Sequence, residues 1–211
     1  MPPPLGILFV YHRAGGTCLD APFTTLLTYS PHILHIMTQD NPVMEALLTR
    51  RSIRKYKQTA VPAELVDRIM EAGTYAASGK SRQPWKIIAI TDPATQAKIR
   101  EANARFLSHP MADPFYGAPV YLLVVSEKAN PNHVYDGTLV MGNMMLAAHA
   151  LGLGSCWINR AREMFELPEW QEWLRGLGIE DEHEGIGFLA LGYTEGEPSP
   201  RLERKACIYR V

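Results

Sequence analysis

Apolar residues that recur every three or four positions predict the helices of this chain. In residues 61–73, Leu65, Ile69 and Ala72 fall on one face, and Pro62 suits the first helical position. Similar patterns predict helices over residues 43–49, 93–106, 134–151 and 168–175. The longest of these is apolar on more than one face, which is typical of a helix buried in a core or in a subunit interface.

Short runs of Ile, Val and Leu predict strands over residues 85–91, 120–125, 155–158 and 187–193. Residues 120–125 read Val-Tyr-Leu-Leu-Val-Val, so neither face of this strand suits water and we expect it at the centre of a sheet. Residues 107–119 form an irregular, aromatic loop of the kind that closes over a pocket. The acidic cluster at 181–184 is interpreted as a solvated turn, with a cation site as the alternative.

Residues 1–43 show no sustained periodicity and are rich in scattered Pro, Thr and His. We expect them to be a flexible N-terminal extension that need not belong to the native domain, with Met37 or Met44 as plausible starts. The alternative is a short arm that packs on a partner subunit. Residues 44–211 are then the folded domain.

Composition narrows the classes of protein that fit this sequence. With 211 residues, 46% of them apolar, the chain can bury a proper core. A net charge of −1 supplies no basic field for nucleic acid, so any phosphate site must be local. Cys18, Cys156 and Cys207 lie far apart, which indicates neither a disulfide framework nor a zinc site and favours the reducing cytoplasm. No stretch reaches the ~18 apolar residues that span a bilayer, and we expect a soluble protein without a metal.

Residues 50–56, Arg-Arg-Ser-Ile-Arg-Lys-Tyr, concentrate four cations and a hydroxyl in seven positions. Guanidinium groups can each direct two N–H bonds onto a phosphate, so Arg50, Arg51 and Arg54 with the Ser52 hydroxyl could hold a phosphomonoester. The alternative is a solvated basic face. Residues 152–157, Gly-Leu-Gly-Ser-Cys-Trp, follow a helix and precede a strand, which is the reverse of a dinucleotide-binding turn. There is also no GxSxG and no Walker loop.

Taken together, several motifs resemble the FMN-dependent nitroreductase family. They are Arg-Arg-Ser-Ile-Arg at 50–54, Ser-Gly-Lys-Ser-Arg-Gln-Pro-Trp at 78–85, Leu-Gly-Leu-Gly-Ser-Cys-Trp-Ile at 151–158, a late Leu-Gly-Tyr at 191–193 and a terminal Arg-Lys at 204–205. The resemblance covers residue 44 to the C-terminus. It implies an α+β fold, with a central mixed, mainly antiparallel sheet flanked by helices, and a homodimer with FMN at the subunit interface.

The resemblance also implies site residues. Arg50, Arg51 and Ser52 match phosphate and ribityl contacts, Arg54 matches a cation near the pyrimidine edge of the flavin, and Arg204 and Lys205 match C-terminal cations that reach the phosphate. Ser81 stands where the family usually has Asn, so Lys80 or water is expected to replace that ring contact, with Gln83 beside it. A backbone N–H at Asn159 or Arg160 matches the group that faces flavin N5.

The function implied is NAD(P)H-dependent reduction of nitroaromatics, quinones or similar small acceptors, by a ping-pong hydride transfer through flavin N5 without a protein acid or base. Phe106, Phe115 and Tyr116 are candidates for stacking on the substrate. Two alternatives remain open: a non-catalytic flavin-binding protein that serves as a sensor or reservoir, and an interaction protein whose basic run binds an acidic partner. Neither the physiological acceptor nor the preferred nicotinamide is readable from the sequence.

Overall fold

The computed structural model describes residues 41–109, 113–200, 203–204 and 208–209. The chain divides into two units after Glu45, and the elements discussed below belong to the second unit, residues 46–211. Helix α2 (Pro42–Thr49) confirms the helix predicted over 43–49, and it leads into the second unit. The predicted extension falls almost wholly outside the described residues, so its boundary with the domain stays a prediction.

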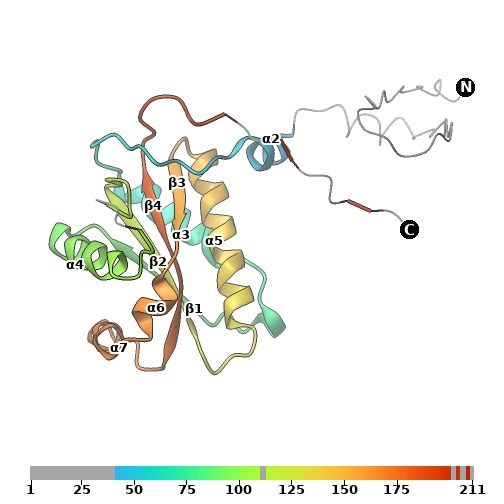
Figure 1. The fold of residues 1–211 in the computed structure, drawn as a ribbon. Helices are drawn as coiled ribbons and strands as arrows, with labels where there is room; N and C mark the ends of the chain where they lie inside the picture. The colour runs from blue at the N-terminus through green and yellow to red at the C-terminus, as the bar shows by residue number, and fades with distance from the viewer. Residues whose placement is uncertain (1–40, 110–112, 201–202, 205–207, 210–211) are drawn as a thin grey trace, which may run out of the picture. The chain divides into compact units, whose positions relative to one another are not determined.

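The described residues form a four-stranded antiparallel sheet in the order β1-β2-β4-β3 (Figure 1). Its strands are β1 (Trp85–Ile90), β2 (Val120–Glu127), β3 (Gly154–Ile158) and β4 (His183–Gly192). A parallel bridge between Ser52 and Ser155 adds a mixed element at the β3 edge. The structure therefore confirms the predicted α+β class with a mixed, mainly antiparallel sheet.

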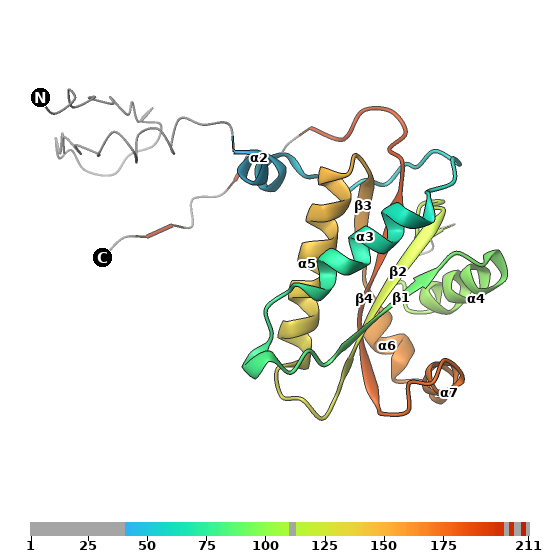
Figure 2. The ribbon, with the colours of Figure 1, turned by 180° about the vertical axis from the view of Figure 1, so that it is seen from behind.

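Helices cover both faces of the sheet, as the apolar character of β2 requires. Alternate β2 residues point to opposite faces, so Tyr121, Leu123 and Val125 pack in one core cluster while Leu122 and Val124 pack in the other. The first cluster also receives side chains from α4 (Pro93–Ala104), α6 (Ala161–Phe165) and α7 (Pro168–Gly176). The second receives them from α3 (Ala63–Thr74) and α5 (His133–Ala150). Figure 2 shows α3 and α5 side by side on their face.

A local sequence signal explains where α4 begins. Asp92 accepts a hydrogen bond from the Thr95 N–H at 2.7 Å and Pro93 follows it, so α4 begins with a capped first turn. The helix α6 was not predicted, because five residues are too few to show a helical period. Strand β4 begins at His183, four residues before the predicted strand.

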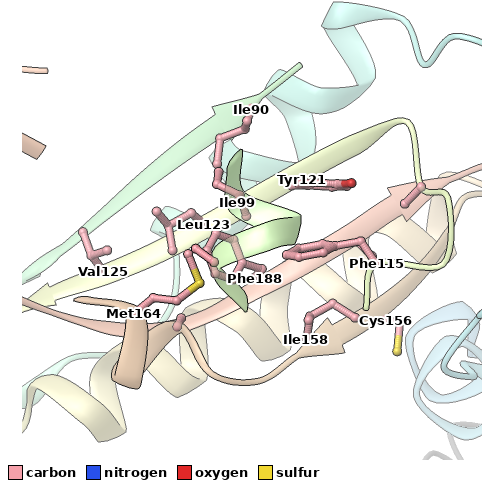
Figure 3. Close-up of a cluster of buried hydrophobic side chains, with 14 of the residues drawn as sticks. Ile90, Ile99, Phe115, Tyr121, Leu123, Val125, Cys156, Ile158, Met164 and Phe188 are labelled. Carbon is pink, nitrogen blue, oxygen red and sulfur yellow. The ribbon is translucent and has the colours of Figure 1, made fainter. Parts of the chain in front are cut away.

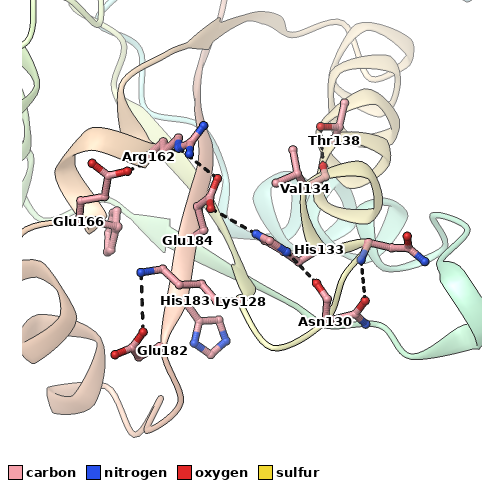
Figure 4. Close-up of polar contacts among 12 residues, drawn as sticks. Lys128, Asn130, His133, Val134, Thr138, Arg162, Glu166, Glu182, His183 and Glu184 are labelled. Atoms are coloured by element: carbon pink, nitrogen blue, oxygen red, sulfur yellow. Dashed lines mark hydrogen bonds and ion pairs between the residues drawn. The ribbon is translucent and has the colours of Figure 1, made fainter.

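That earlier start changes the interpretation of the acidic cluster at 181–184. His183 is buried, and Glu184 is half-buried between a histidine and an arginine (Figure 4). The Glu184 Oε2 atom lies 3.2 Å from His133 Nε2 at the start of α5, and its Oε1 atom lies 3.5 Å from Arg162 Nε on α6. The prediction of a solvated turn holds for Asp181 and Glu182, which are exposed, but is wrong for His183 and Glu184. Glu184 joins β4 to α5 and α6, and the His183 backbone is hydrogen-bonded to Gln171 on α7.

Among the described residues, no helix is both long enough and apolar enough to cross a membrane.

Candidate functional site

The arginine segment, residues 50–56, lies along the outer edge of β3. The Ile53 N–H donates to the Ser155 carbonyl at 2.9 Å, and just beyond the segment the Lys57 N–H donates to the Tyr193 carbonyl at the same distance. Ile53 and Tyr56 turn inward and are buried, whereas Ser52 and Arg54 are exposed. The segment is thus anchored through its apolar residues and presents its polar ones outward.

The three arginines of this segment have different surroundings. Arg51 Nη1 donates to the carbonyls of Thr49 and Arg50, both at 3.0 Å, so part of its bonding capacity is used within the chain. Arg54 lies over the Tyr116 ring, 5.9 Å from the ring centre. Arg50 Nη1 is buried and has no hydrogen-bond acceptor among the described residues. A buried charged donor left without an acceptor is costly, so this atom indicates a missing anionic partner.

Cys156 lies behind the same segment and is not suited to nucleophilic chemistry. Burial raises the pKa of the Cys156 thiol, while the guanidinium groups of Arg54 and Arg50 and a hydrogen bond with Ser52 act in the opposite direction. Burial prevails, so the thiol stays protonated near neutral pH.

Two pockets open beside the arginine segment. One of about 350 Å³ is lined by Arg51, Ser155 and His149 among others. The second, of about 200 Å³, is lined by Ser52, Arg54 and Lys55. Both also contact Ile53 and the chain that follows β4, at Thr194, Glu197 and Pro198. These pockets offer a small ligand a place directly against the cations.

The polar turn between α3 and β1 is held in an unusual backbone conformation. Lys80, Ser81 and Gln83 have φ values of 55°, 54° and 48°, in the left-handed region that side chains rarely adopt. The Asp136 carboxylate accepts a hydrogen bond from the Gly79 N–H at 3.0 Å and so fixes the turn against α5. All three strained residues are exposed. Such strain persists where surrounding contacts impose it and is concentrated at functional sites.

This turn and the arginine segment lie at opposite ends of α5. Asp136, which holds the turn, is in the first turn of the helix, whereas His149 near its end lies 2.8 Å from the Thr49 hydroxyl, next to the arginine segment. The rise of about 1.5 Å per residue puts these two helix positions about 20 Å apart. One chain therefore does not bring the two groups of predicted cofactor residues together.

The loop between β3 and α6 holds the other predicted ring contact. Asn159 is exposed, and Arg160 adopts a left-handed conformation with φ of 74°. The Arg160 side chain turns away from solvent, because its Nε donates to Asn103 Oδ1 at 2.9 Å. Its backbone N–H donates to no described residue. The structure thus leaves the backbone donor of Arg160, rather than its guanidinium, available to a ligand.

The three aromatic candidates for substrate stacking have different environments. Phe115 has no exposed surface and stacks on Tyr121 at 4.0 Å between ring centres, with Phe188 edge-on at 5.3 Å (Figure 3). Its ring belongs to the core, which corrects the expectation of a substrate contact, because a buried ring has no face to offer. Tyr116 is half-buried beside Arg54, and Phe106 is exposed in the turn that follows α4. Both stay candidates.

The C-terminal cations are not joined to the arginine segment by any contact that the structure describes. Arg204 is exposed, and Lys205 lies outside the described residues. Their predicted contact with a phosphate stays a prediction.

Sequence reasoning missed two polar residues that organise the site. Asp136 offered a signal, since an acidic residue near the start of a nearly all-apolar helix needs a partner. Asn103 offered none, because it stands in a helix rich in polar residues and its complete burial is set by the packing of α4.

Comparison with known proteins agrees with this architecture. The model of the nitroreductase family matches residues 47–193. A protein of Methanothermobacter thermautotrophicus named "Putative NADH dehydrogenase/NAD(P)H nitroreductase" is 34% identical over 75% of this chain and 81% of its own length. The iodotyrosine deiodinase of Haliscomenobacter hydrossis is 28% identical over 74% and 81% of the two chains. A Bacteroides fragilis nitroreductase crystallised with bound FMN has a TM-score of 0.72 and 29% identity, and the match covers 81% of this chain and 99% of that one. The family match, which covers most of the chain, and the identity to the archaeal protein establish that the chain belongs to the nitroreductase family.

Proposed function

We propose that this protein is an FMN-dependent NAD(P)H oxidoreductase that reduces nitroaromatics, quinones or related small acceptors. The observation that carries the proposal is the buried Nη1 of Arg50, which has no acceptor among the described residues. Ser52, two positions further along the chain, is exposed. The family relatives named NAD(P)H nitroreductase and the neighbour crystallised with FMN support it.

The residues present fit FMN at both of its ends. A phosphate needs several cationic donors and a hydroxyl, which Arg50, Arg51 and Ser52 supply within three positions. The ring needs a donor facing N5, which the backbone N–H of Arg160 supplies. Ser155, next to the arginine segment, and Arg160 are five residues apart, so about 17 Å of extended chain separates the two groups at most. That separation suits a cofactor whose phosphate and ring are held apart by a ribityl chain.

Bound FMN would supply the redox chemistry, taking hydride from a nicotinamide and passing electrons to the acceptor. Arg50 and Ser52 bind the phosphate and fix the position of the cofactor along β3. Arg54, held over Tyr116, places a positive charge where Coulomb attraction favours an electron-rich ring. The Arg160 N–H orients the ring edge. No side chain has to move a proton in the hydride step.

We further propose a homodimer with FMN between the subunits. The strained turn at residues 78–83 and the arginine segment lie at opposite ends of α5, so they can serve one ligand when two copies pack antiparallel along this helix. An exposed stripe on α5 supports this arrangement: Tyr135 is 73% and Leu139 48% exposed, and Gly142 and Ala150 continue the stripe. Covering such a stripe in a dimer removes apolar surface from water.

The test is anaerobic reduction of the FMN-loaded protein. NADH or NADPH should bleach the oxidised flavin bands, and a nitroaromatic or a quinone added afterwards should restore them with matching stoichiometry. Flavin that binds but is not reduced by either nicotinamide would favour the non-catalytic flavin carrier. Protein that takes up no FMN would favour the interaction protein.

A further inference from the structure

Asn103 is a fully buried amide at the end of α4 whose hydrogen bonds converge on one loop. Its Nδ2 donates to the Asn159 carbonyl at 2.9 Å, and its Oδ1 accepts from Arg160 Nε at the same distance. A further contact joins Nδ2 to Met164 Sδ at 3.6 Å. Both polar ends of one side chain are therefore committed to two consecutive residues of the β3–α6 loop.

This bonding goes beyond filling the core. Packing alone would be served by Leu, whose side chain has the same branched heavy-atom skeleton and no polar atoms to satisfy. Asn103 instead fixes the peptide that joins Asn159 to Arg160 from two directions: from its carbonyl and from the side chain that follows it. Arg160 is held at φ of 74°, a conformation that an L residue keeps where its surroundings impose it. The result is a backbone N–H whose direction is set by a buried contact.

We propose that Asn103 is a positioning residue of the flavin reaction, which acts by aiming the Arg160 backbone N–H at flavin N5. The proposal rests on the proposed function, since it needs a flavin at that N–H. Oxidised N5 offers a lone pair to such a donor, whereas reduced N5 carries a hydrogen of its own. A well-aimed N–H therefore favours the oxidised form and fixes the ring for hydride transfer. Loosening the loop should raise the midpoint potential and slow the hydride step.

The experiment compares Asn103→Leu and Asn103→Asp with the wild type, all loaded with FMN. In the Leu variant we expect FMN affinity within about threefold of wild type, because the phosphate contacts at Arg50 are untouched. We expect the rate constant of reduction by NADPH to fall by about tenfold or more, since misplacement by about 1 Å can cost up to ~100-fold. Asn103→Asp keeps the acceptor for Arg160 and loses the donor to Asn159. Its rate constant of reduction should therefore lie between those of the wild type and the Leu variant.

Gln96 provides a matched control on the same helix. It is another buried amide, and its Nε2 donates to the carbonyls of Ile90 at 3.0 Å and Pro119 at 2.9 Å, neither of which is in the β3–α6 loop. Gln96→Leu should lower thermal stability about as much as Asn103→Leu does. It should leave the midpoint potential and the reduction rate of the bound flavin unchanged.

Should Asn103→Leu fail to fold, Arg160→Met removes the hydrogen bond between Arg160 Nε and Asn103 Oδ1 without changing the buried amide, and it should shift the potential in the same direction. Unchanged potential and rate in the Asn103 variants, or equal shifts in the Gln96 variant, would overturn the role of Asn103 while leaving the proposed function intact. A wild-type protein that binds no flavin would overturn both.

Discussion

Two arginines of the candidate site show what a residue's type does and does not reveal. Both Arg50 and Arg160 carry the same charge, and both were predicted near the cofactor. The structure satisfies the Arg160 guanidinium with Asn103 and leaves Arg50 Nη1 buried without an acceptor among the described residues. We therefore assign the proposed phosphate contact to the Arg50 side chain and the proposed flavin contact to the backbone of Arg160. A sequence motif places both residues but cannot distinguish these roles.

Because of Tyr56, the free energy of unfolding should depend on pH in the alkaline range. Its hydroxyl donates to the carbonyls of Ile53 at 2.7 Å and Ala190 at 3.2 Å, and burial raises the pKa of this phenol well above its usual range. The unfolded phenol loses its proton near pH ~10, whereas the folded one keeps it. Above that pH the unfolded state binds fewer protons, so the free energy of unfolding must fall as pH rises.

Urea unfolding at neutral pH and above pH ~10 measures this effect. Tyr56→Phe should be less stable at neutral pH by about 1 kcal/mol, for the lost hydrogen bond, and should lose less stability on going to high pH than the wild type does. Some slope should remain, because burial also raises the pKa of Tyr121 and of Cys156. Equal alkaline slopes in the two proteins would contradict this interpretation of Tyr56.

Among the elements, α5 sets the distance between the turn at residues 78–83 and the arginine segment. Its apolar pattern predicted a helix over 134–151, and the observed helix, His133–Ala150, differs by one residue at each end. The pattern could not show that the polar residues near its two ends, Asp136 and His149, hold different functional segments. That information depends on contacts between residues 57 and 100 positions apart in the chain.

If each flavin is shared between two copies along α5, defective chains should complement one another. One chain carries Arg50→Met, and the other carries Lys80→Glu with Ser81→Glu, which places bulky negative charge on the exposed turn. Refolding the two chains together should restore FMN binding to one of the two sites of a mixed dimer, because that site receives an intact turn and an intact arginine segment. Each chain refolded alone is the control. Mixed samples that bind no more FMN than the controls would indicate a site within a single chain.

Across the whole molecule, local periodicity predicted most of the architecture. The strand predicted over 120–125 lies in the interior of the sheet, and α3, α4 and α7 begin and end within two residues of prediction. These elements could be predicted because an element that is buried on one face or on both has a characteristic spacing of apolar residues in its sequence. Phe115 could not be assigned in this way, because its aromatic, irregular loop suggested a pocket. In the structure, Asp113 accepts hydrogen bonds from the N–H groups of Phe115 and Gly117, and the turn folds into the core.

The most direct measurement of the central claim is an equilibrium titration of the apoprotein with FMN and, in parallel, with riboflavin, which lacks the phosphate. The wild type should bind one FMN per chain and should prefer it strongly over riboflavin. Arg50→Met should weaken FMN binding about 10- to 100-fold, since a hydrogen bond to a charged group contributes about 1.5–3 kcal/mol. It should leave riboflavin binding nearly unchanged.

Arg105→Met is the matched control, because Arg105 is an exposed cation paired with Glu101 on α4, away from the arginine segment. That variant should bind both flavins as the wild type does. A wild type that takes up no FMN, or an Arg50→Met variant that keeps the full preference for FMN over riboflavin, would contradict the assignment of the arginine segment as the phosphate site of a flavoenzyme.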